Sequence, residues 1–592
     1  MAAGRGPNGS DPWGRAPAFM GYDSSSRRRL EWEARVFMAG LSDEAGAAQP
    51  LAVAAKQLGA PSLDQVSKLE DYVHLTLYTP AGGDPKLHLQ DHDTHAIRAS
   101  LFFNSSLPQY QQAMPDFIAS CNAQRPFWLV CWDEQRASET WRAYNYPHVA
   151  AVYWSLYRLA RIANLTTRAA WPFYLQQAVQ TFKAMWQFGK GYGRWGLMVG
   201  SVFTHIYQDV VWEGWQQEQL VLDQIIQERV AFWRSRTFPF ASEMAWDNTG
   251  HEEIYSWLQT LNDTQGMEAT VQAVLAYQST QPHWAVAGSA RRWWDFWING
   301  ASNIGNERVF HHYAAPLNAI PLAQHFLRHP ARLYLLRVAS AGTGGSLSNI
   351  HPHGGASMGL HGDPSSLQLD AYSADFGIGF YGHCMEAGAT LACDNVVGWM
   401  CFNCDLGQVS TTAALKIHPP LTSTVQVDSV FGACHRLAQA DVVPRDAWRR
   451  RLFLAPLALL FTVDNAWLAR AELHLGVKTV RLHLTRHTYE SSSLNVSSNA
   501  VQHGLAILTV RRTAPTGSHG AAANPPLRVA CEGPPSYGSS DRPRLLVART
   551  RKLGGASLIT VTGGCELAPH RGPDAVSVTL RRELTTVDVS WE

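Results

Sequence analysis

The fold is decided by two adjacent stretches, PHVAAVYWSLYRLARIAN at residues 147–164 and RAAWPFYLQQAVQTFKAMWQ at residues 168–187. In both, apolar residues recur at every third or fourth position, which is the period of one face of an α-helix. The connection at 165–167 is short enough to make the two helices antiparallel neighbours. These stretches therefore predict a helical hairpin.

The same periodicity continues along the chain. Earlier helical patterns occur at Leu51–Leu58 and Ser62–Tyr72, and later ones at 195–210, 213–235, 250–262, 265–279, 305–327, 330–341 and 376–391. Roughly ten helices in antiparallel pairs form either an open solenoid or a closed toroid. The segments show no fixed-period repeat, which argues against a TPR or HEAT repeat array.

The pattern changes after about Asn395, where short β-branched or aliphatic runs are bounded by Gly, Pro and Ser. These runs are Val477–Thr485, Leu505–Val510, Arg544–Ala548, Ser557–Thr562, Val576–Arg581 and Thr586–Trp591. They predict an all-β domain, most simply a sandwich. The expected organisation is a disordered lead at 1–30, a mixed segment at 31–140, a helical domain at 141–394 and a β-rich domain at 395–592.

Composition narrows the class of protein. The 592 residues are 46% hydrophobic and 16% charged, as in globular chains, and the net charge of +1 argues against a nucleic-acid binder. No apolar run reaches the roughly 18–20 residues of a membrane span. The 22 Trp suit a cleft in which aromatic rings stack on sugar rings, although large aromatics also fill helical cores.

The cysteines and the N-terminus say less about function. An odd count of nine Cys is no disulfide framework, although single bridges are possible, and Cys401-Phe-Asn-Cys404 lacks the further ligands of a zinc site. We therefore expect neither a metal nor a cofactor. Residues 1–22 contain no readable signal peptide, yet sequons at Asn8, Asn104, Asn164, Asn262 and Asn495 would suit a secreted glycoprotein.

The densest group of acidic residues lies between Glu243 and Tyr255. Glycoside hydrolysis requires two carboxyl groups, an acid for the leaving oxygen and a base or nucleophile opposite it. Thr249-x-x-Glu252 matches a capping box, which gives Glu252 a structural explanation. Glu253 lies about 100° further around the helix, so it is the leading candidate for the acid, with an exposed helix-terminal carboxylate as the alternative. Asp247 either contributes a carboxylate or begins a turn.

Other residues are candidates for binding the substrate. Arg and His beside aromatic platforms suit an acidic or heavily hydroxylated sugar, although a helix with one packed aromatic face would show the same pattern. Pro147 favours a helix start that would place its neighbours at a helix mouth. The candidates are Tyr144, Tyr146, His148, Trp246, His251, His283, Trp284, Arg291, Arg292, Trp294, Asp295, His311 and His312. Asp370 and Asp375 are candidates for the second carboxylate.

Several of these segments resemble an uncharacterised domain family that is placed in the six-hairpin glycosidase superfamily of bacteria and fungi. The similar segments are Gly40–Gly46, Tyr144–His148, Gly193–Gly196, Trp246–Glu253, Ala290–Asp295, Leu317–Pro321 and Asp370–Asp375. The resemblance implies an (α/α)6 toroid with β-sandwich elements, and secretion. It supplies a fold and a superfamily, but no established substrate or catalytic pair.

We expect a glycoside hydrolase acting on a polysaccharide or oligosaccharide, most simply an inverting one. Glu253 would be the general acid, and Asp247, Asp370 or Asp375 would activate water. Inversion requires carboxyl groups about 6.5–9.5 Å apart, and retention about 5–5.5 Å. One alternative is a polysaccharide lyase that uses Tyr146, His148, Asn145 and Arg291, and another is a glycan-binding protein without catalysis. In each case the partner is a carbohydrate rather than a nucleic acid or a membrane.

Overall fold

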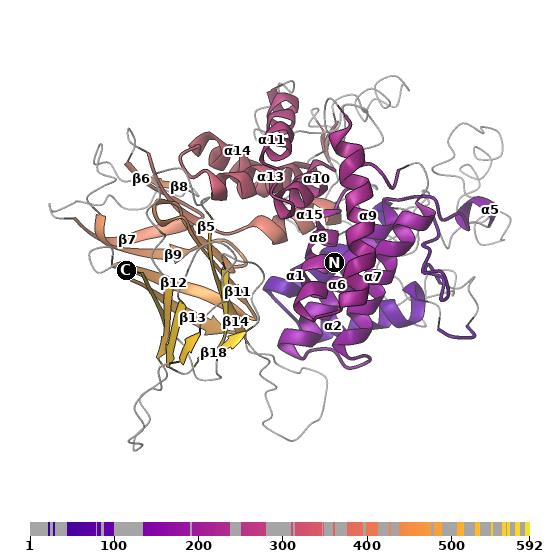
Figure 1. Cartoon of the computed structure of the whole chain (residues 1–592), viewed down its shortest axis with the longest axis horizontal. Helices are drawn as coiled ribbons and strands as arrows, with labels where there is room; N and C mark the ends of the chain where they lie inside the picture. Colours follow the sequence, from indigo (N-terminus) through magenta and orange to yellow (C-terminus); the bar gives the residue numbers. More distant parts are fainter. Residues whose placement is uncertain are drawn as a thin grey trace, which may run out of the picture.

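The computed structural model describes residues 22–23, 28–29, 44–78, 80–83, 88–99, 134–189, 192–236, 250–279, 309–311, 314–345, 347, 359–361, 376–394, 398–411, 425–427, 437–474, 479–487, 506–513, 527–532, 546–548, 559–563, 565–568, 575–580 and 586–591. Figure 1 shows helices gathered on one side of the molecule and the C-terminal strands on the other. The predicted order of helices followed by sheets is confirmed.

Most predicted helices are present within a few residues of their expected bounds. The helices are α1 Glu44–Gly59, α2 Leu63–Tyr72, η1 Val73–Leu77, α5 Glu134–Ala137, α6 Asn145–Arg158, η3 Leu159–Ala163, α7 Trp171–Phe188, α8 Ser201–Trp212, α9 Gln216–Arg234, α10 His251–Thr260, α11 Thr264–Ser279, α13 Ala314–Arg328, α14 Leu333–Gly345 and α15 Phe376–Glu386. The segment predicted to be mixed therefore contributes α1 and α2 to the helical layer.

Two helix predictions are wrong at one end. The segment predicted as helix from residue 305 contains strand β3, Val309–His311, which pairs with β4, Gly359–His361. The helix predicted to reach residue 391 ends at Glu386, and strand β5 begins at Ala389. Short apolar runs do not distinguish a buried strand from a helix by periodicity, and Gly388 interrupts this one.

Contacts among the helices run in a cycle, which we call the helical ring. Helix α1 packs on α6, α6 on α8, α8 on α10, α10 on α13, α13 on α15, and α15 returns to α1. Helices α2, α7, α9, α11 and α14 each pack on the ring helix that precedes them. Gly382 permits one close approach, because a Cβ there would lie 2.9 Å from the carbonyl carbon of Pro316.

The strands form two large sheets within the described residues. They are β1 Tyr22–Asp23, β2 Arg28–Arg29, β6 Gly398–Phe402, β7 Cys404–Thr411, β8 Val425–Val427, β9 Leu437–Pro444, β10 Arg451–Leu454, β11 Leu459–Asp464, β12 Ala466–His474, β13 Thr479–Arg486, β14 Ala506–Arg512, β15 Leu527–Glu532, β16 Leu546–Ala548, β17 Ile559–Gly563, β18 Cys565–Ala568, β19 Ala575–Leu580 and β20 Thr586–Trp591, with β3, β4 and β5 as given above. The six predicted strands appear as β13, β14, β16, β17, β19 and β20. Part of the predicted lead pairs as β1 with β2.

One sheet has the order β18-β19-β14-β11-β10-β5-β6-β8, and we call it the helix-side sheet. The other has the order β16-β17-β15-β20-β13-β12-β9-β7, and we call it the outer sheet. Side chains along β10 point alternately to the two faces of the helix-side sheet. Leu452 and Leu454 enter the core between the sheets, whereas Phe453 belongs to the core of the helices, which is why we use this name. The helix-side sheet is therefore buried on both faces.

Buried charges join the helices to this sheet. Arg158 at the end of α6 lies 2.5 Å from the carboxylate of Asp464 on β11 and 3.5 Å from that of Asp209 on α8. Arg450 also bonds Asp464, at 2.6 Å, and Trp154 donates its Nε1–H to Asp209 at 2.8 Å. Asp464 thus lies within 2.6 Å of two arginines, whereas the contact of Asp209 with Arg158 is longer, at 3.5 Å.

This imbalance predicts a pH effect on stability. Burial raises the pKa of Asp209 from 3.8 to about 7, and Arg158 only partly opposes the shift. The folded state therefore holds this proton more tightly than the unfolded chain, so the contribution of Asp209 to stability falls as pH rises from about 4 to about 7. Urea unfolding at several pH values should show Asp209→Asn gaining stability over wild type across that window. A mutant-minus-wild-type difference that stays constant with pH would contradict this assignment.

Candidate functional site

The candidate site lies where the loop before α8 meets the first turn of α10. Residues 192–200 of this loop contain the half-buried aromatic side chains of Tyr192 and Trp195. The same loop ends at Ser201, the first residue of α8. It therefore connects surface aromatic rings with the buried carboxyl groups at the start of α10.

Glu253 is engaged in a fully buried ion pair. Its side chain is 0% exposed and that of its partner Arg229, on α9, is 1% exposed. Both carboxylate oxygens bond the Arg229 guanidinium, and the N–H of Leu197 donates to Oε2 at 2.8 Å. Arg229 also donates to the carbonyls of Gly193 and Trp195, at 2.9 and 2.7 Å. These contacts favour a structural role for Glu253, which ties α9, α10 and the loop together.

Glu252, in contrast, has a carboxylate oxygen that accepts no hydrogen bond from the described residues. The N–H of Ser201 donates to its Oε2 at 3.0 Å, whereas its Oε1 is buried without a hydrogen-bond partner. Burial raises the pKa of Glu252 well above its ordinary value, hydrogen bonding from Ser201 opposes the shift, and the charge of Glu253 adds to it. Its surroundings therefore favour the protonated form of Glu252.

The predicted capping box is wrong. Helix α10 begins at His251 with Gly250 as its N-cap, so the cap is not Thr249, which lies outside the described residues. Glu252 consequently does not reach back along its own helix, and its carboxyl group faces the start of α8 instead. The structural explanation that the sequence offered for Glu252 does not hold.

Further polar atoms are buried near Glu252 on neighbouring ring helices. The hydroxyl oxygens of Ser201 and Thr204 on α8, and of Tyr381 on α15, are buried without a hydrogen-bond partner. The charge of Glu252 contributes to raising the pKa of Tyr381, behind the larger effect of burial, so the two groups are neighbours. Such atoms are rare in folded proteins and indicate a strained or functional place. A proton donor among hydroxyl groups suits a ligand that is itself rich in hydroxyls.

Gly200 makes this arrangement possible. A Cβ at this position would lie 2.5 Å from the carboxyl carbon of Glu253 and 2.7 Å from the carbonyl oxygen of Leu197. Gly200→Ala should therefore displace Glu253 from Arg229 and lower the free energy of unfolding by about 1–3 kcal/mol. Urea denaturation measures the loss. Gly344→Ala is the control, because a Cβ there meets nothing within 4 Å. Equal midpoints for the two variants would refute the steric argument.

Comparison with known families identifies the chain only at family level. The sequence model of a family of unknown function, DUF5695, matches residues 7–433. The chain belongs to this family. Comparison with curated proteins finds no significant match. The DUF5695 match spans the helical ring and the strands up to β8, so both carboxyl groups of the site lie inside it.

Other predicted site residues within the DUF5695 region are mostly buried. Tyr146 donates its hydroxyl to the carbonyl of Thr140 at 2.7 Å and accepts the N–H of Ile97 at 3.3 Å. His148 and His251 are buried, at 0% and 2% exposure. These contacts place Tyr146 in the framework of α6 rather than at a surface.

Among the predicted substrate-binding residues, Tyr144 lies beside the loop at 192–200. Its buried ring lies 6.1 Å from that of Tyr192, and the Arg142 guanidinium lies 5.1 Å over it. The ring of Trp141 also lies 6.0 Å from the ring of Tyr192. His311 is in β3, opposite Gly359. The remaining predicted residues lie outside the described residues: Asp247, Trp246, His283, Trp284, Arg291, Arg292, Trp294, Asp295, His312, Asp370 and Asp375.

Sequence reasoning missed the residues that give Glu252 and Glu253 different surroundings, namely Arg229, Ser201 and Tyr381. A signal for Arg229 existed, because it falls on the apolar face of α9 at helical spacing. That face is formed by Leu222, Ile225, Ile226, Arg229 and Trp233. An arginine on a buried stripe needs a buried acid. Ser201 and Tyr381 gave no comparable signal.

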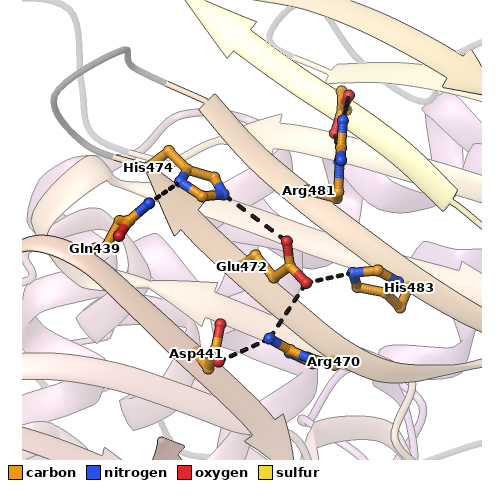
Figure 2. A network of polar contacts seen from close by, with 8 residues as sticks. Gln439, Asp441, Arg470, Glu472, His474, Arg481 and His483 are labelled. Atoms are coloured by element: carbon orange, nitrogen blue, oxygen red, sulfur yellow. Dashed lines mark hydrogen bonds and ion pairs between the residues drawn. The ribbon is translucent and has the colours of Figure 1, made fainter. Parts of the chain in front are cut away.

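A second polar cluster lies on the exposed face of the outer sheet (Figure 2). Glu472 lies 2.9 Å from Nε2 of His483, 3.2 Å from Arg470 and 3.8 Å from Nε2 of His474. Asp441 also bonds Arg470, at 2.7 Å. The side chains are partly exposed, so such pairs contribute little to stability. Across the described residues, no group of three or more His, Cys, Asp or Glu could hold a metal ion.

A disulfide joins two consecutive strands, β6 and β7. Cys401 and Cys404 form a disulfide, with their Cα atoms 5.3 Å apart, and Cys393 is also disulfide-bonded. The CxxC sequence is therefore a short covalent link between β6 and β7.

Among the described helices, none combines the length and the apolar character needed to cross a bilayer.

Proposed function

We propose that this DUF5695 chain is a glycoside hydrolase of the six-hairpin superfamily, and that its helical ring is an (α/α)6 toroid. The cyclic contacts from α1 through α6, α8, α10 and α13 to α15 support the proposal, because each inner helix of such a toroid touches two others. The outer helices, each packed on the preceding ring helix, support it in the same way.

The observation that carries the proposed activity is the contrast between two adjacent carboxyl groups. Glu253 is ion-paired with Arg229, whereas burial raises the pKa of the neighbouring Glu252 and so favours its protonated form. An acid that holds its proton at neutral pH is what protonation of a glycosidic oxygen requires. We therefore assign the general acid to Glu252 rather than to Glu253. The partner that activates water is proposed among Asp247, Asp370 and Asp375.

The surface aromatic rings supply a reason to expect a sugar. Tyr192 and Trp195 are half-buried on the loop before α8, and the ring of Trp141 lies 6.0 Å from that of Tyr192 in a tilted arrangement. The Arg236 guanidinium lies 5.3 Å from the Trp195 ring. Flat aromatic faces with charged neighbours suit the apolar faces and hydroxyl groups of a pyranose. This loop is the proposed entrance to the site.

The disulfides support a proposed location outside the cytosol. Disulfides persist in oxidising compartments and are rare where thiols are kept reduced. The Cys401–Cys404 bridge and the bonded Cys393 fit an extracellular carbohydrate-active protein.

A substrate screen tests the activity. The purified protein would be incubated with neutral and uronic polysaccharides while reducing ends and absorbance near roughly 235 nm are followed together, since a lyase creates a double bond and a hydrolase does not. Reducing ends without absorbance are expected. Absorbance rising in step would replace the hydrolase with a lyase, although Tyr146, its proposed base, has its hydroxyl bonded to the backbone. Retention of a glycan without either signal would favour a binding protein.

A further inference from the structure

A cleft separates the helical ring from the helix-side sheet. It has a volume of about 50 Å³ and is lined by residues of α13, α14 and α15 on one side and of β5, β10 and β11 on the other. Its sheet wall includes a row of directly opposed residues, Thr390, Phe453 and Leu460. Arg511 on β14 is opposite Leu460, so it continues the same row on the same face of the sheet.

Two charged groups at this cleft, Glu386 and Arg511, differ in how well they are paired. Glu386, at the end of α15, is held by Arg451 at 2.8 Å and by Gln324 Nε2 at 2.8 Å. Within the described residues, Arg511 makes one long hydrogen bond, 3.4 Å from its Nη2 to Gln324 Oε1. In the part of the chain that the structure describes, no carboxylate lies within ion-pair distance of Arg511.

Arg328 is a second arginine whose guanidinium is only partly hydrogen-bonded. It lies one turn after Gln324 on α13, so both side chains are on one face of that helix. Its Nη2 donates to Asn262 at 3.1 Å, but its Nε is buried without a partner. Burial lowers the pKa of Arg511 to about 10, and the nearby charges of Arg451 and Arg328 lower it further than Glu386 and Tyr255 raise it.

We propose that Arg511 and Arg328 bind an oxyanion, the carboxylate, sulfate or phosphate group of a small molecule, at the junction of the helical ring and the helix-side sheet. Both guanidinium groups are partly buried, and among the described residues neither is paired with a carboxylate, so a bound anion would relieve the repulsion between them. The planar guanidinium fork matches carboxylate and phosphate oxygens in pairs. The Tyr255 hydroxyl, 3.2 Å from His325 Nδ1, lies beside both arginines and offers a further polar contact. The site is separate from Glu252 and does not depend on the proposed hydrolase activity.

Calorimetric titration of the full chain with sodium sulfate, phosphate and glucuronate, against chloride at matched ionic strength, tests the proposal. At least one oxyanion should bind saturably, and binding should weaken as salt rises. Arg511→Gln should weaken it about 10- to 100-fold, the effect of losing a charged hydrogen bond. Arg481→Gln is the matched control, because Arg481 is bonded twice to Asp588 on the outer sheet. Preference for glucuronate would identify a carboxylate ligand, and preference for sulfate or phosphate an ester.

The absence of saturable binding for every oxyanion would overturn the proposal, as would unchanged binding in both Arg511→Gln and Arg328→Gln. A second measurement separates ligand binding from a structural role. Without ligand, Arg511→Gln should unfold at the same temperature as wild type or higher, because it removes an unpaired charge. A lower unfolding temperature would mean that Arg511 supports the fold, and that outcome also contradicts the proposal.

Discussion

Replacing Glu252 by glutamine should abolish glycan cleavage while leaving the fold intact. The amide can still accept the Ser201 N–H at the position of Oε2, so the contact between α8 and α10 remains. It cannot give up a proton to a leaving oxygen, and loss of a general acid lowers the rate by about 10²–10⁴-fold. The rate of reducing-end release from the substrate found in the screen measures the effect.

The pH profile gives an independent check on the same residue. A general acid must be protonated, so activity should be lost as pH rises through the raised pKa of Glu252. Stability should change in the same direction, because a carboxyl group whose folded-state pKa is raised destabilises the fold once it ionises. Glu252→Gln should therefore unfold no more easily than wild type at neutral pH. Glu472→Gln, on the exposed face of the outer sheet, is the matched control and should retain full activity. If Glu252→Gln remains fully active, the acid is another residue.

Removing the charge of Arg229 should have the largest effect on stability. Arg229→Met would leave Glu253 buried and unpaired, and would remove the bonds to the carbonyls of Gly193 and Trp195. Breaking a buried pair from one side lowers the free energy of unfolding by about 3–5 kcal/mol. Chemical denaturation at neutral pH measures this loss.

An exposed pair of the same geometry provides the comparison. Arg481 makes two bonds of 2.8 Å to Asp588, but its side chain is 40% exposed. Arg481→Met should therefore cost no more than about 1 kcal/mol. The double variant Arg229→Met with Glu253→Leu should recover much of the loss, since apolar residues tolerate burial. A loss of similar size in Arg229→Met and Arg481→Met would show that burial does not strengthen the inner pair.

The sequence predicts the elements of this fold well where one period persists over many residues. Helices α6 and α7 have a sustained 3.6-residue pattern, and β13 and β20 have short β-branched runs between turn residues. Prediction fails where an apolar run is short, as at β3 and β5. Those strands pair with partners far along the chain, β4 for the first and β10 for the second, and local periodicity contains no information about such partners.

The candidate site shows a similar division. The sequence singles out the segment that holds Glu252 and Glu253, but it favours Glu253 because Thr249 supplies a local explanation for Glu252. Tertiary contacts reverse that preference: Arg229 comes from another helix, and Ser201 draws Glu252 away from its own helix end. Assigning a role to either carboxyl group therefore requires knowing which helices meet, and no pattern within one segment reveals that.

The cycle of helix contacts also determines when the protein can fold during synthesis. Helix α1 packs on α15, and residues 60–375 lie between them. Because the chain leaves the ribosome from its N-terminus, α1 cannot contact α15 until nearly all of the ring has been translated. Contacts so distant in sequence form slowly, and the waiting apolar surface is open to aggregation. Chains that terminate before Phe376 should therefore depend on chaperones, whereas chains that end after Glu386 can close the ring.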